Sequence, residues 1–144
     1  MVRIAVEARN AARRAAKAQQ DDNLDFDAVW VVFDVDDHPN LTEALELAER
    51  ENLRIALSNP CFELWALLHF EDHRKHIARK ALASRLRAFL EDYEKELDFA
   101  KLHEGYANAL KRANALDLAA ATNGKPRCNP TTGVHQLTEM IRLK

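Results

Sequence analysis

The order of apolar and polar residues predicts alternating strands and helices over the first half of the chain. Residues 28–34 form a continuous apolar run, rich in β-branched and aromatic side chains, that ends in Asp34; this is typical of a strand buried on both faces. From Asn40 to about residue 52, apolar residues recur at helical spacing behind a capping box. Residues 54–58 are again short and apolar. Strand, helix and strand in this order predict a βαβ unit with parallel strands.

Most of the remaining chain is expected to be helical. An Ala- and Arg-rich segment predicts a helix over residues 2–20, and Pro60 opens a helix that runs to about residue 70. Further helices are expected over 76–92, 99–121 and 132–143, with a loop over 122–130. The predicted fold class is α/β: a βαβ unit with a short parallel sheet, then a mainly helical C-terminal half. We expect one domain over 1–144, with an α/β part (1–70) and a helical part (71–144).

Two parallel strands with one crossover leave two long sheet edges. They cannot cover both faces of a run as apolar as Val29–Phe33. Either the sheet continues in a second copy of the chain, as a homo-oligomer, or earlier strands lie upstream of Met1.

Composition and charge narrow the class of protein. The 144 residues are 47% hydrophobic and 31% charged, with three Gly and four Pro, which excludes a disordered chain and argues against a turn-rich β protein. No uncharged stretch approaches the ~20 residues of a membrane span, so we expect a cytoplasmic protein without membrane contact. Net charge is +4 over 1–20, −10 over 21–52 and +4 over 53–144. This pattern suits either a solvated surface or a metal centre within a polyanion-binding face.

Three aspartates follow the first strand directly. If the strand continues through Asp36, then Asp34 and Asp36 project to the same side, and Asp37 adds a third carboxylate. Such groups repel one another unless one is protonated or a hard cation such as Mg²⁺ or Mn²⁺ is bound. Ligands of open α/β sheets bind beyond the carboxyl ends of the strands, which favours the cation. The alternative is an acidic turn before Pro39.

Glu63 is the only charged residue between Pro60 and His69. Its helix should begin beside the aspartates, so Glu63 is a candidate ligand, water-orienting group or general base. The alternative is a carboxylate that simply interacts with the helix dipole. Phe62 and Trp65 are interpreted as core residues.

The histidines carry weaker signals. His69, His73 and His76 have a spacing that could place them on one helical face as zinc ligands, but a polar helix end explains them better. His38 and His135 are candidate proton carriers or phosphate contacts, and each is more often a surface or core residue. Cys61 and Cys128 have no CxxC partner and are expected to be reduced thiols.

Four segments together resemble the RloB-like proteins. They are Val-Trp-Val-Val-Phe-Asp-Val-Asp-Asp-His-Pro-Asn (29–40), the run from Ile55 to Phe70, a group at Tyr93, Lys95 and Asp98–Phe99, and Asn-Pro-Thr-Thr-Gly-Val-His (129–135). The resemblance implies a relative of the TOPRIM nuclease fold, a role in prokaryotic phage defence (abortive infection) and an ATPase partner of the RloA kind. In TOPRIM proteins the Asp-x-Asp after a strand binds Mg²⁺, which corresponds here to Asp34 and Asp36.

The resemblance covers residues 28–143 and departs from the family at the front. Such proteins usually begin with a strand ending in a Cys-Glu-Gly-x-x-Thr-Glu-like motif, whose Glu completes the metal site. Nothing before Ala28 resembles that motif, so we expect a chain without the N-terminal part of the pattern. Two hypotheses follow. The chain is a Mg²⁺- or Mn²⁺-dependent nuclease acting on DNA or RNA through Asp34, Asp36, Asp37 and Glu63, or it is a non-catalytic module that binds the ATPase or itself.

Overall fold

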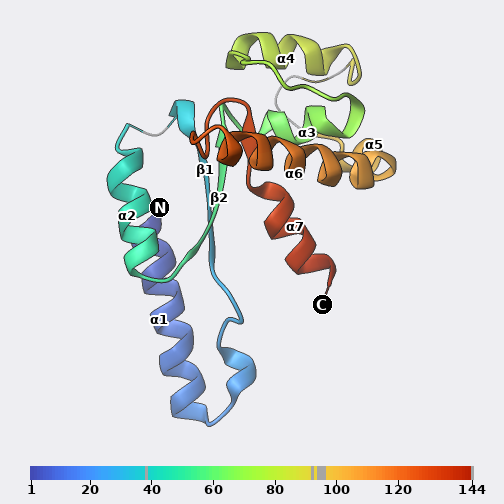
Figure 1. Ribbon diagram of the computed structural model, residues 1–144. Coiled ribbons are helices and arrows are strands. Elements are labelled where there is room, and N and C mark those ends of the chain that lie inside the picture. Colours follow the sequence, from blue (N-terminus) through green and yellow to red (C-terminus); the bar gives the residue numbers. More distant parts are fainter. Residues whose placement is uncertain (38, 92, 94–96, 144) are drawn as a thin grey trace. The chain divides into compact units, whose positions relative to one another are not determined.

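The computed structural model describes residues 1–37, 39–91, 93 and 97–143, except for the side chain of Asp37 (Figure 1). The chain divides into two compact units. The first unit contains Met1–Val32 and Pro39–Ile55, and the second contains Phe33–His38 and Ala56–Lys144. Strands β1 (Trp30–Asp34) and β2 (Arg54–Asn59) each begin in the first unit and end in the second.

The first unit is formed by α1 (Val2–Gln19), the short turn η1 (Asp22–Leu24) and α2 (Leu41–Arg50), together with the beginnings of the two strands. Arg9 joins α1 to the residue that follows α2. Its Nη2 lies 2.9 Å from Oε2 of Glu51, and its Nη1 donates to the Glu51 carbonyl. The N–H of Arg54 donates to the carbonyl of Val29 at 2.9 Å, where the two strands begin to pair.

The sheet has the order β1-β2-β3, with β1 and β2 parallel and β3 (Thr131–Thr132) antiparallel to β2. The α/β prediction with a short parallel strand pair is therefore confirmed. The third strand was missed: β3 pairs Thr132 with Ser58 and Thr131 with Asn59, where the sequence predicted a loop running into a helix. A two-residue strand is too short to show a period. In the described chain β3 pairs with the last two residues of β2. It therefore covers part of the β2 edge that the sequence predicted to be unpaired.

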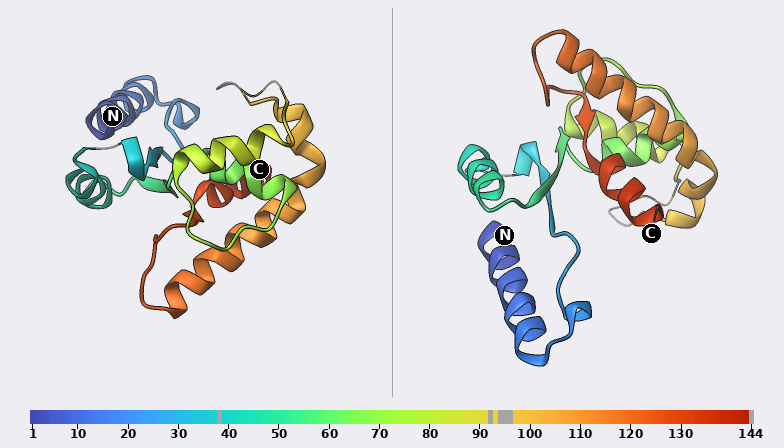
Figure 2. Two further views of the ribbon diagram at one scale, coloured as in Figure 1. Left: turned by 90° about the horizontal axis from the view of Figure 1, so that it is seen from above. Right: turned by 60° about the horizontal axis from the view of Figure 1, so that its bottom comes forward.

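Helix α3 (Glu63–Phe70) is the centre of the second unit. Leu64, Ala66, Leu67 and Leu68 have no exposed surface, and Trp65 is 3% exposed. A helix that is apolar on all sides is buried on all sides. Figures 1 and 2 show why, because α3 lies between α4 (Arg79–Arg87) and α6 (Tyr106–Thr122) and contacts both.

The helix expected to open at Pro60 begins only at Glu63, and two further predicted helices are also shorter than expected. The helix expected over 76–92 is α4, which covers only Arg79–Arg87. The helix expected over 99–121 is divided into α5 (Phe99–Leu102), η3 (His103–Gly105) and α6. The interruption falls where Gly105 meets the backbone of α3: a Cβ at Gly105 would lie 2.3 Å from the carbonyl oxygen of His69.

The C-terminal helix α7 (Val134–Arg142) begins two residues later than expected, because β3 precedes it. Among the helices in the described ranges, none combines the length and the apolar character needed to cross a membrane.

Candidate functional site

Asp34 ends β1 and connects that strand to the start of α3. Its Oδ1 accepts a hydrogen bond from the N–H of Phe62 at 2.9 Å, one residue before the helix begins. The first N–H groups of a helix have no partner within it, so a carboxylate here satisfies one of them and interacts well with the helix dipole. The predicted proximity of the strand end to the helix start is thus present in the second unit.

The other oxygen of Asp34 faces a cation. Nη2 of Arg79, the first residue of α4, lies 3.5 Å from Oδ2 of Asp34. The Asp34 side chain is 20% exposed and that of Arg79 is 38% exposed, so the pair lies at the surface of the second unit and remains accessible to water. Nothing in the local sequence pattern indicated Arg79, because the contact joins segments 45 positions apart.

Glu63 is the first residue of α3 and accepts a hydrogen bond from the hydroxyl of Tyr93, with 2.9 Å between Oε1 and Oη. Burial alone would raise the pKa of Glu63. Hydrogen bonds from the Cys61 thiol, the backbone and Tyr93, together with the charge of Arg79, outweigh burial and lower it. Glu63 is therefore an anion held by neutral donors.

The pKa values of Cys61 and Tyr93, the two side chains that donate to Glu63, are shifted upward. Burial raises the pKa of the Cys61 thiol, and the neighbouring Glu63 raises it further. Burial and the hydrogen bond to Glu63 likewise raise the pKa of Tyr93. Both groups stay protonated at neutral pH and donate to the carboxylate. Neither Cys61 nor Tyr93 was predicted from the sequence as part of the site, although Tyr93 belongs to a segment that resembles the family.

Asp36 lies differently from what the sequence predicted. The strand ends at Asp34, and Val35–Asp37 form a 3₁₀ turn (η2), so the argument that strand alternation brings Asp34 and Asp36 to the same side was wrong. Asp36 is exposed, and its N–H donates to the carbonyl of Pro60 at 3.3 Å. The side chain of Asp37, a predicted ligand, falls outside the described part of the chain, as does His38.

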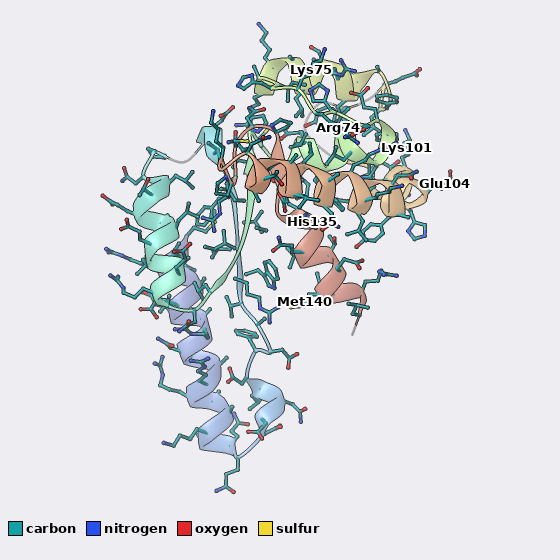
Figure 3. All side chains as sticks on the ribbon, in the orientation of Figure 1. Arg74, Lys75, Lys101, Glu104, His135 and Met140 are labelled. Carbon is teal, nitrogen blue, oxygen red and sulfur yellow. The ribbon has the colours of Figure 1, made fainter. Side chains whose placement is uncertain are left out.

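His69 and His135 are both buried in the second unit. His69 is 7% exposed, its Nδ1 lies 2.8 Å from the carbonyl oxygen of Trp65, and burial lowers its pKa. His135 is 3% exposed, with Nδ1 2.8 Å from the Thr132 carbonyl oxygen and Nε2 3.6 Å from Asp117. His135 and Met140 both lie on α7 (Figure 3).

Trp65 is a core residue as predicted, and it meets the rings of His69 and Tyr106 edge to face at centroid distances of 4.7 and 6.0 Å. Phe62, expected to be equally buried, is only partly so.

Strand β1 is buried on one face only, at Val31 and Phe33, and not on both faces as the sequence predicted. These features define an α/β protein in which the carboxyl end of a half-buried strand places an aspartate at the start of a buried helix. A family model described as RloB-like protein matches residues 3–141, nearly the whole chain, and the chain belongs to this family. The match begins at Arg3, ahead of the segment that carried the resemblance. No curated protein and no solved structure shows a significant match to the chain.

From the sequence we expected a magnesium ion at the end of β1, held by Asp34, Asp36 and Asp37. Asp34 and Asp36 are oxygen ligands of the kind Mg²⁺ takes. The described residues contain no group of three or more His, Cys, Asp or Glu side chains that could hold a metal ion. Mg²⁺ commonly keeps several waters and uses one or two carboxylates together with substrate phosphates. As described, Oδ1 of Asp34 accepts from Phe62, Oδ2 faces Arg79, and Asp36 lies on the 3₁₀ turn that follows, so these residues alone do not form a ready site for the ion.

Proposed function

We propose that this RloB-like protein is a nuclease that depends on Mg²⁺ or Mn²⁺ and acts on DNA or RNA within a cytoplasmic phage-defence system of prokaryotes, together with an ATPase partner of the RloA kind. The observation that carries the proposal is the position of Asp34. Asp34 is a partly exposed carboxylate at the end of β1, and it accepts a hydrogen bond from Phe62 directly before α3, whose first residue is the anion Glu63.

Each residue then has a defined task. Asp34 and Asp36, with Asp37 as a third acid, would hold the cation, which supplies charge neutralisation at the phosphate when bound. Glu63 is ionised and therefore able to accept a proton from a water molecule. Tyr93 and Cys61 keep its carboxylate in place by donating to it.

Basic residues near the site support a polyanionic substrate. Helix α4 contains four bases and no acid. The exposed Arg74 and Lys75 precede α4 (Figure 3), and Arg74 forms an ion pair with Asp72. Positive segments of this kind bind phosphate groups through charge and with little dependence on sequence.

The test is cleavage of single-stranded and duplex DNA and RNA with Mg²⁺ or Mn²⁺. Asp36→Asn is the sharpest variant, because Asp36 is exposed and its loss should leave the melting temperature unchanged while cleavage falls at least tenfold. Asp22→Asn removes another exposed aspartate, which lies in η1 of the first unit, and should cleave as the wild type does. Equal cleavage by the wild type and Asp34→Asn would identify a contaminating nuclease and contradict the proposal.

A second candidate function is the non-catalytic interaction module. It is favoured by a cavity of about 580 Å³ in the second unit, beside the exposed Ile141. The cavity is lined by His103, Glu104, Tyr106, Ala107, Thr138, Ile141 and Arg142. Sedimentation of the wild type and of Ile141→Glu, alone and with the ATPase, tests this candidate. If the chain is an interaction module, the wild type should associate with itself or with the ATPase, and Ile141→Glu should abolish that association. Asp36→Asn should associate as the wild type does.

A further inference from the structure

The candidate site lies at the start of α3, and a pair of stacked aromatic rings lies at the end of the same helix. Phe70 is the last residue of α3, and its ring stacks on that of Phe89, which follows α4. The ring centroids lie 5.0 Å apart, and the two ring planes differ by 6°. Phe70 is partly buried, whereas Phe89 is 42% exposed. The pair therefore presents one aromatic ring at the surface of the second unit.

The exposed ring of Phe89 is held in place by its neighbours in the chain. The N–H of Phe89 donates to the carbonyl of Leu86 at 3.0 Å. Leu86 has no exposed surface and Leu90 is 4% exposed, so the backbone is anchored on both sides of the ring. A ring that is already in place loses little conformational freedom when a second flat group stacks on it. Every nucleobase has such a flat face, so stacking on an aromatic side chain tolerates any base sequence.

Helix α4 runs beside α3 from the candidate site to the aromatic pair (Figures 1 and 2). Arg79, the first residue of α4, lies 3.5 Å from Asp34, whereas Arg85, in its last turn, pairs with the residue that follows α3. The rise of α3 from Glu63 to Phe70 is about 10 Å, which corresponds to about three stacked nucleotides. A short strand is therefore long enough to reach from the aromatic pair to the carboxylates.

The charges on α4 suit the phosphate groups of such a strand. Lys80 and Arg87 are exposed on this helix, and Nε of Arg87 donates to the neutral carbonyl oxygen of Tyr93. The acid beside the aromatic pair, Glu71, accepts two hydrogen bonds from Arg85, so its negative charge is compensated. Phosphate groups bind to basic residues of this kind whatever the base sequence.

We propose that Phe89 is a stacking platform for one base of a single-stranded nucleic acid, whose phosphate groups lie along the basic residues of α4. A duplex pairs its bases and stacks them on one another, so the platform favours single strands. Stacking involves the base and not the sugar, so strands of DNA and RNA share the required chemistry. The proposal rests on the proposed function and deepens it, because it names the substrate class of the nuclease.

The experiment is fluorescence anisotropy of labelled strands of about twelve nucleotides with the full chain, in EDTA so that no strand is cleaved. The strands are oligothymidylate, oligouridylate, an abasic strand that keeps the phosphates, and a duplex of the same length. The wild type should bind oligothymidylate or oligouridylate roughly tenfold more tightly than the abasic strand, because one base stacks on the ring. The tighter of the two identifies the preferred sugar.

Three variants assign this difference to the ring. Phe89→Leu should bind the base-containing strand roughly tenfold more weakly and the abasic strand as the wild type does. Phe89→Tyr keeps an aromatic ring and should retain the difference between the strands. Phe26→Leu is the matched control, because Phe26 is 52% exposed in the first unit, and it should bind every strand as the wild type does.

The outcomes separate the platform from the nuclease. Equal affinity of the wild type for the base-containing and abasic strands, full affinity in a folded Phe89→Leu, or tighter binding of the duplex would overturn the platform and leave the nuclease proposal standing. No binding of any strand would contradict both. If Phe89→Leu fails to fold, the ring-proton resonances of Phe89 in the wild type decide: they must move upfield with the base-containing strand and not with the abasic one, and unmoved resonances refute stacking.

Discussion

Replacing Gly105 by alanine tests how closely η3 approaches α3. Gly105 has an ordinary φ of −84°, so glycine is needed there for space and not for backbone conformation. An added Cβ would lie 2.3 Å from the carbonyl oxygen of His69 and 2.9 Å from its carbonyl carbon. Ordinary contact begins at 3.4 Å, so the two backbones would have to separate by about 1 Å.

The expected cost follows from that displacement. Overpacking a well-filled site destabilises a protein by about 1–3 kcal/mol, and Gly→Ala returns about 0.4–1 kcal/mol through the entropy of the unfolded chain. We therefore expect Gly105→Ala to lower the free energy of unfolding by about 1–2 kcal/mol. For a chain of this size the melting temperature should fall by roughly 3–8 °C.

Thermal unfolding followed by circular dichroism is the assay, with urea unfolding as the second measurement. Gly124→Asn is the matched control, since Gly124 has a φ of +65° that Asn tolerates and no heavy atom lies within 4 Å of its added Cβ. The control should stay within about 0.5 kcal/mol of the wild type. An unchanged or raised melting temperature of Gly105→Ala would refute the close approach.

Three further predictions concern the core and the anion Glu63. Trp65→Ala should cost about 3–5 kcal/mol in urea unfolding, because the side chain is 3% exposed, and an unchanged urea midpoint would contradict this. Tyr93→Phe should raise the pKa of Glu63, measured by carboxyl NMR, because the lost hydroxyl favoured the ionised form; an unmoved pKa would show that the bond does not form in solution. The lowered pKa of Glu63 contributes stability that is fully present above the ordinary value of 4.5 and is lost as the pH falls through the folded value. Between pH 5 and the folded pKa of Glu63, the free energy of unfolding should therefore fall less in Glu63→Gln than in the wild type. An equal fall in both proteins, measured by urea unfolding at each pH, would contradict this.

Only some residues of the candidate site could be predicted from the sequence. Asp34 and Glu63 stood out because a charge after a buried strand, or inside an apolar helix, breaks a local pattern. The prediction for Asp36, which assumed that strand alternation continues past Asp34, was wrong, because a 3₁₀ turn follows β1 and the N–H of Asp36 donates to the carbonyl of Pro60. Arg79 and Tyr93 were missed as site residues because they reach the carboxylates through contacts of 45 and 30 positions along the chain.

What the sequence determined by itself is the α/β class, the parallel strand pair and the burial of α3, because each follows from runs and periods of apolar side chains within a few residues. Only the tertiary structure decided the features that depend on distant partners. Strand β3 forms by pairing with β2, where Ser58 lies opposite Thr132, 74 positions further along the chain. The hydroxyl oxygens of these two buried residues lie 2.8 Å apart. The helix predicted over 99–121 is interrupted at a glycine that touches His69. Local helix or strand propensity does not predict such contacts, because they stabilise the chain only after the distant segments have come together.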